Sequence, residues 1–109
     1  MINATAKNRN VLRKHAREAL SDYSPVMTWL LLSDNGDLSI LQEPQGQTCY
    51  VGDEEVLAET GGFYKAHGNG AAVDRYGRKF STQRDYLIDL LGRDEYNRVF
   101  GFVTEKKTA

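Results

Sequence analysis

The fold is decided by residues 26–42, which read VMTWLLLSDNGDLSILQ. β-Branched, aromatic and leucine residues fill 26–33, and the DNGD sequence at 34–37 supplies residues that tolerate the positive φ of a tight turn. Apolar residues return at 38–42, so the stretch predicts a β-hairpin. Four successive apolar residues at 29–32 indicate that the first strand is covered on both faces and is therefore central. The second strand alternates apolar and polar residues, as a half-exposed strand does.

A helix is predicted before this hairpin, over residues 4–23. Its apolar residues recur at three- and four-residue spacing and so share one helical face: Leu12, Ala16, Ala19 and Tyr23. Pro25 ends the helix, because proline disfavours the helical conformation in the preceding residue.

Two more helices are predicted near the C-terminus. Ser81 is a plausible N-cap for the first, whose apolar stripe contains Tyr86, Leu87, Leu90 and Leu91, and Gly92 fits the position just past its end. Asp94 can cap a further short helix in which Val99 and Phe100 pack inward.

The middle of the chain carries weaker signals. The turn sequence at 44–47 leads to a short strand at 48–51, giving a three-strand meander. Acidic residues then favour the N-terminal end of a short helix over 53–60, stopped by Gly61-Gly62. Residues 63–75 are interpreted as a loop with at most one strand. Residues 72–75 and 78–80 can pair as a small hairpin around Tyr76-Gly77.

Together these elements predict an α+β fold. We expect an antiparallel sheet of four to five strands, with the N-terminal helix and the C-terminal helix that begins near Ser81 packed on one face. At 109 residues the chain has the size of one domain, 1–109, with a frayed tail over 104–109. An exposed edge strand or the uncovered sheet face would offer a surface to a partner or to a second copy in a homodimer.

Composition narrows the function classes. Hydrophobic residues make up 40% and charged residues 27% of the chain, which is too apolar for a disordered protein. The formal net charge is -1, so the protein as a whole has no strong electrostatic attraction to nucleic acid or to an acidic membrane. The single cysteine, Cys49, and the absence of a signal-peptide pattern favour a cytoplasmic location. No apolar run approaches the length of a membrane span, so we expect no membrane partner.

Two groups of cations are candidate binding residues. On the N-terminal helix, Lys7, Arg13, Lys14 and Arg17 fall on one side, away from the apolar face, and His15 is placed beside them. Such a stripe can be an ordinary solvated face, can meet an acidic protein, or can contact phosphates. A second group lies on the predicted hairpin tip, where a polar turn is the alternative interpretation: Arg75, Arg78 and Lys79.

An acidic and aromatic group is the candidate partner-binding patch. Its members are Asp53, Glu54, Glu55, Glu59, Phe63, Tyr64 and Tyr76. On the predicted helix Glu55 and Glu59 lie one turn apart, and the run sits at an exposed helix start, where nothing argues for the burial that acid–base catalysis needs. The chain has more aromatic residues than its core needs. We expect the exposed ones in the loop-rich stretch at 63–76, because aromatic side chains anchor protein interfaces.

No catalytic or cofactor motif stands out. Cys49 and His67 are the pair that could form a nucleophile and its base, but no oxyanion-hole motif flanks Cys49, and a cysteine in a strand usually behaves as a small apolar residue. The histidines and the cysteine lack zinc-ligand spacing, and the acidic residues lack the spacing of a calcium loop. We therefore predict no enzyme activity, no metal and no cofactor.

The leading hypothesis is a non-enzymatic interaction module that binds a protein or nucleoprotein complex and alters its activity by occupying a surface. Small chains without motifs are common among phage and mobile-element products, including inhibitors of bacterial defence systems such as anti-CRISPR proteins. The alternative is a small nucleic-acid-binding accessory domain that uses the basic helix and the basic hairpin tip. It requires those two elements to lie on one face.

Overall fold

The computed structural model describes residues 1–20, 26–44, 54–60, 72–73 and 78–102. Its elements in chain order are α1 (Ala6–Ala19), β1 (Val26–Leu32), β2 (Leu38–Pro44), β3 (Glu55–Thr60), β4 (Ala72–Val73), β5 (Lys79–Phe80), α2 (Gln83–Leu91) and α3 (Arg93–Phe100).

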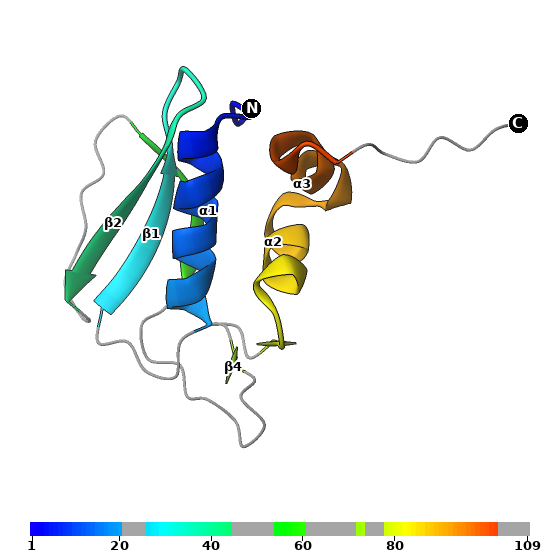
Figure 1. Ribbon diagram of the computed structural model, residues 1–109. Coiled ribbons are helices and arrows are strands. Elements are labelled where there is room, and N and C mark those ends of the chain that lie inside the picture. Colours follow the sequence, from blue (N-terminus) through cyan, green and yellow to red (C-terminus); the bar gives the residue numbers. More distant parts are fainter. Residues whose placement is uncertain (21–25, 45–53, 61–71, 74–77, 103–109) are drawn as a thin grey trace, which may run out of the picture.

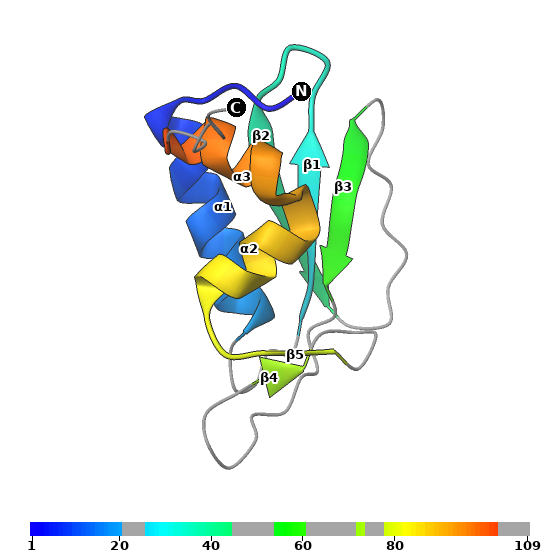
Figure 2. The same ribbon diagram turned by 90° about the vertical axis from the view of Figure 1, so that its right-hand side faces the viewer.

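The main sheet has three antiparallel strands in the order β2-β1-β3. β1 is central, which confirms the prediction from its apolar run. α1 packs against β1 and β2, and Figures 1 and 2 show all three helices on the same side of this sheet. The α+β class is thus confirmed. In the described part of the chain, β4 and β5 form a separate two-stranded sheet and do not extend the main one, and the predicted strand at 48–51 lies outside the described residues.

β3 departs most clearly from the sequence-based expectation. The short helix predicted over 53–60 is wrong, because Glu55–Thr60 form a strand that pairs antiparallel with β1. Without this partner, the backbone N–H and C=O groups along one edge of an apolar strand would lack hydrogen bonds. Pairing of this kind outweighs a weak local preference for helix. Glu55 and Glu59 therefore lie along an extended strand and are not one helical turn apart.

The β1–β2 turn forms where the sequence predicts it. Leu32 pairs with Leu38, and the Gly36 N–H donates to the Ser33 carbonyl at 3.0 Å. Gly36 has a φ of +91°, and an added Cβ would lie 2.8 Å from Asn3 Oδ1. Glycine is needed here both for its backbone conformation and for the close approach of the N-terminal segment.

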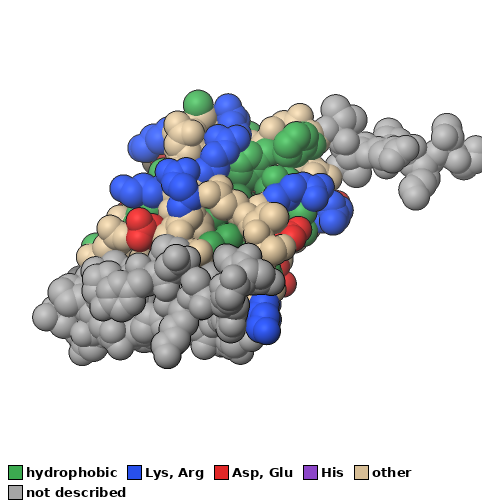
Figure 3. Space-filling model, turned by 60° about the horizontal axis from the view of Figure 1, so that its bottom comes forward, with side chains coloured by type: hydrophobic (Ala, Val, Ile, Leu, Met, Phe, Trp, Pro, Cys, Tyr) green, Lys and Arg blue, Asp and Glu red, His purple; other side chains and the backbone are tan. Residues whose placement is uncertain are grey.

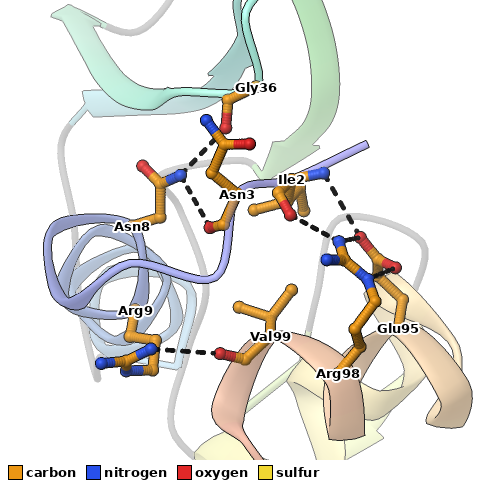
Figure 4. A network of polar contacts seen from close by, with 8 residues as sticks. All are labelled: Ile2, Asn3, Asn8, Arg9, Gly36, Glu95, Arg98 and Val99. Carbon is orange, nitrogen blue, oxygen red and sulfur yellow. Dashed lines mark hydrogen bonds and ion pairs between the residues drawn. The ribbon is translucent and has the colours of Figure 1, made fainter.

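Asn8 of α1 fastens this turn to the helix. Its side-chain amide donates to the carbonyls of Asn3 and Gly36 at 2.9 Å each, and its Oδ1 accepts from the Leu38 N–H at 2.9 Å. Figure 4 shows the two carbonyl contacts. The same network continues to α3, where Arg98 pairs with Glu95 at 2.7 Å and also donates to the Ile2 carbonyl. The pKa of Glu95 lies below its usual value, chiefly because the Arg98 side chain donates to its carboxylate.

The core lies between the helices and the sheet. Leu12, Ala16 and Ala19 of α1 are buried, as their spacing predicts. The core also includes Ile2, Leu30, Leu38, Tyr86, Leu87, Tyr96 and Val99. The placement of His15 beside the basic stripe is wrong, because His15 is fully buried with its Nε2 3.1 Å from the Tyr86 hydroxyl of α2.

The N-terminus of α2 lies one residue later than predicted. Thr82 is the N-cap, and its hydroxyl accepts from the Asp85 N–H at 3.0 Å. Ser81 precedes the cap and is exposed. Gly92 ends the helix as predicted, and its N–H donates to the Ile88 carbonyl at 2.8 Å.

This difference of one residue gives a matched test. We expect Thr82→Ala to lower the free energy of unfolding by about 1 kcal/mol, because the Asp85 N–H loses its acceptor. Ser81→Ala should stay within about 0.5 kcal/mol of the wild type. Urea unfolding of both variants makes the comparison, and a larger loss in Ser81→Ala would contradict the assigned cap.

Candidate functional site

The outer face of α1 is cationic. Lys7, Arg13, Lys14 and Arg17 are all exposed, as the helical spacing predicts. Within the described residues, none of the four has a carboxylate within ion-pair distance. These four side chains are therefore not held in ion pairs with the described residues, and this face can attract an anionic partner.

Two arginines of α1 reach across to α3. Arg9 donates to the Val99 carbonyl at 3.4 Å, near the C-terminal end of α3, where backbone carbonyls lack helical partners. Arg13 places its guanidinium 5.0 Å from the centre of the Phe100 ring, a cation–π distance. The basic face of α1 is thus continuous with the end of α3.

Three aromatic rings continue the surface from the end of α3 beside Arg13, and they belong to Tyr96, Phe100 and Phe102. Phe100 and Tyr96 have ring centres 4.7 Å apart, and Tyr96 and Phe102 stack with centres 5.8 Å apart at an interplanar angle of 19°. Tyr96 is buried, Phe100 is half-buried, and Phe102 is 55% exposed. The three rings form a series that begins beside Arg13 and ends at the surface.

The position of Phe102 is set by the end of α3. Gly101 adopts the left-handed conformation with a φ of +80°, its N–H bonds the Arg98 carbonyl, and the Phe102 N–H bonds the Asn97 carbonyl at 2.8 Å. This pair of hydrogen bonds is the Schellman motif, which commonly brings the residue after the glycine back onto the last turn. Phe102 is thereby held against Tyr96.

We call this region the α1–α3 surface and define it by Arg9, Arg13, Arg17, Phe100 and Phe102. The three arginines are four residues apart and so form one row along α1. Figure 3 shows apolar side chains exposed between groups of Lys and Arg side chains on one face of the molecule. The surface combines cations with accessible aromatic rings.

The basic hairpin contributes less than predicted. Its strands pair as expected, with Ala72 opposite Phe80 and Val73 opposite Lys79. Arg78 forms an ion pair with Asp89 at 2.6 Å, and Lys79 is exposed. β4 and β5 lie beyond the C-terminal end of α1 in Figure 2, away from its middle. Arg75 lies outside the described residues.

Little of the predicted acidic and aromatic patch is described. Glu54 is half-buried and accepts a 3.5 Å hydrogen bond from the Ser39 hydroxyl, and Glu55 is exposed on β3. Glu59 also belongs to β3. Asp53, Phe63, Tyr64 and Tyr76 lie outside the described residues, so the patch as a whole stays a prediction.

The proposed Cys49–His67 pair also falls outside the described residues. Among the residues that the structure does describe, no group of three or more His, Cys, Asp or Glu side chains is placed to hold a metal ion. No helix in the same residues is long and apolar enough to cross a membrane.

Comparison with protein-family models, curated proteins and solved structures gives no match. The functional argument therefore depends on the residues of this chain.

Sequence reasoning missed three of the five residues of the α1–α3 surface. Phe102 lies outside the stretch at 63–76 where the exposed aromatic residues are expected, and yet it is exposed. A glycine followed by an aromatic residue just past a helix is a recognisable Schellman signal and could have identified it. Arg9 could have been found from its four-residue spacing to Arg13. Phe100 packs less deeply than predicted, whereas Val99 is fully buried as expected.

Proposed function

We propose that the protein is a non-enzymatic interaction module that binds a protein or nucleoprotein complex through its α1 face and alters the activity of that complex by occupying a surface. The observation that carries the proposal is the group of exposed cations on α1, which lack carboxylate partners among the described residues. Cations gathered on one face of a helix favour association with an anionic surface.

The finer part of the proposal concerns the biological setting. In this proposal the protein is a phage- or mobile-element-encoded inhibitor of a bacterial defence system, similar to anti-CRISPR proteins. It would act in the cytoplasm, where such complexes operate. A homodimer through a sheet edge would double the number of α1 faces presented to the target.

The first test is capture from a bacterial lysate. We expect tagged wild-type protein to retain a defined complex after nuclease treatment, identified by mass spectrometry. The triple variant Lys7→Gln, Lys14→Gln, Arg17→Gln should lose that complex, because it removes three exposed charges from α1.

A triple variant elsewhere provides the matched control. Lys79→Gln, Arg84→Gln, Arg93→Gln removes the same charge from exposed positions on β5, α2 and α3, and it should retain the complex. Equal capture by both triple variants would rule out α1 as the binding face.

A nucleic-acid-binding accessory domain that uses α1 and the end of α3, without the basic hairpin, is the second candidate. The observation that favours it is the placement of the exposed Phe102 ring and the Arg13–Phe100 contact at the edge of the basic face. In the capture experiment this function predicts that nuclease removes all bound material.

A further inference from the structure

We propose that the α1–α3 surface binds single-stranded nucleic acid, with an unpaired base stacked on Phe102 and the backbone phosphates paired with the arginine row of α1. This inference rests on the second candidate function, nucleic-acid binding, since it names the anionic partner that the α1 face takes. It gives the aromatic rings of Phe102 and Phe100 a role in binding that the charges of α1 alone would not require. It also adds Arg9 to the cations that contact the ligand.

Phe102 has the properties of a stacking platform. One face of its ring is already seated on Tyr96, with an interplanar angle of 19°, yet the residue remains 55% exposed. The two backbone hydrogen bonds at the end of α3 fix the main chain from which this ring projects. A ring that is held in place before binding loses little conformational freedom when a base stacks on it.

The arginine row supplies the matching charge. Arg9, Arg13 and Arg17 succeed one another at about 6 Å along the helix axis, and Arg9 and Arg13 are tied to α3 beside the rings. A row of guanidinium groups that follows a line of phosphates is the arrangement proteins use to track a single strand. Arg13 contacts both parts of the surface, so phosphate and base contacts fall next to each other.

A single strand fits this surface better than a duplex or an acidic protein. Bases in a duplex are stacked on one another and cannot reach an exposed ring, whereas the bases of a single strand can. Here Phe100 is in direct contact with a guanidinium, which suits a ligand that is both anionic and aromatic. Because stacking is tolerant of base identity, we infer little sequence preference.

Fluorescence anisotropy with labelled oligo(dT), oligo(U) and a duplex of the same length tests the inference. We expect the single strands to bind more tightly than the duplex, and affinity to fall steeply between about 50 mM and about 200 mM salt. Phe102→Ala should weaken single-strand binding by about 5- to 150-fold, which corresponds to the loss of one base stack of about 1–3 kcal/mol.

Conservative variants separate stacking from apolar contact. Phe102→Trp should retain affinity, and Phe102→Leu should lose as much as Phe102→Ala, since leucine has no ring. Arg13→Gln should lower the slope of log affinity against log salt concentration by about one. Lys79→Gln on β5 is the matched control and should leave both the affinity and this slope unchanged. Circular dichroism confirms that each variant is folded.

Three results would overturn the inference. Equal affinity for duplex and single strand would reduce the surface to a general polyanion site. Full affinity in Phe102→Leu would point to an apolar anchor for a protein. No single-strand binding at low salt, together with capture of a nuclease-resistant complex that the α1 triple variant loses, would overturn this inference and leave the proposed function intact. Capture that is unaffected by the α1 triple variant would instead remove the proposed function itself.

Discussion

Replacing Asn8 by leucine is expected to lower the free energy of unfolding by about 3–5 kcal/mol. Asn8 is fully buried, and its side chain makes three hydrogen bonds, to the Asn3 carbonyl, the Gly36 carbonyl and the Leu38 N–H. Leucine has a similar size but can satisfy none of these groups. Each buried polar group left without a partner costs about 1–3 kcal/mol.

Two further variants make the test specific. Asn10→Leu is the matched control, because Asn10 lies on the same helix, is exposed, and accepts only a 3.4 Å bond from Arg13 among the described contacts. It should change stability by no more than about 0.5 kcal/mol. Asn8→Asp keeps the shape but turns a donor that faces two carbonyls into an acceptor, so it should also be strongly destabilising near neutral pH. Urea unfolding measures all three. If Asn8→Leu and Asn10→Leu were equally stable, the hydrogen bonds of the Asn8 side chain would make no net contribution to the free energy of unfolding.

Asn8 also shows where sequence reasoning ends. The elements that could be predicted have local causes: the DNGD turn at 34–37, the apolar spacing of α1, and the cap and glycine around α2. Asn8 and His15 are polar residues of types that usually lie at the surface, and no neighbour in the sequence indicates that they are buried. Their partners, Gly36 and Tyr86, lie 28 and 71 residues away. Burial of a polar side chain is decided by such distant partners.

The error at β3 has the same origin. The acidic start of 53–60 resembles a helix N-terminus, and this local preference is real but small. β1 has two edges, and β2 covers only one of them. A strand that fills the second edge gains a ladder of hydrogen bonds that local sequence does not reveal. The predicted helix therefore fails at the point where a long-range strand partner competes with a short-range signal.

The candidate site also has one part that the sequence predicts and one part that depends on distant partners. The exposed cations of α1 follow from helical periodicity alone. The contact of Arg13 with Phe100 joins positions 87 residues apart by the sequence numbering, and it depends on how α1 meets α3. A sequence can show that a helix face is basic. It cannot show which aromatic ring another helix places beside that face.

Acidification is expected to destabilise the protein through His15. Burial lowers the pKa of His15 from 6.5 to about 4. The unfolded chain therefore takes up a proton as the pH falls through 6.5, whereas the folded chain resists protonation until the pH is near 4. Stability is fully present above pH 6.5 and is lost as the pH falls, by about 2 kcal/mol at pH 5 and about 3 kcal/mol at pH 4. Urea unfolding across pH 4–8 measures this slope.

The variant His15→Gln isolates this contribution. It should be less stable at neutral pH, but its stability should change far less between pH 7 and pH 5, because the titrating ring is gone. Tyr86→Phe should keep the wild-type slope, since the low pKa comes from burial and not from the hydrogen bond to the Tyr86 hydroxyl. Glu95 also adds acid sensitivity, but its pKa is lowered from 4.5, so its window lies below pH 5. Parallel curves for wild type and His15→Gln between pH 7 and pH 5 would show that His15 becomes protonated without cost, and that α1 and α2 can separate enough to hydrate the ring.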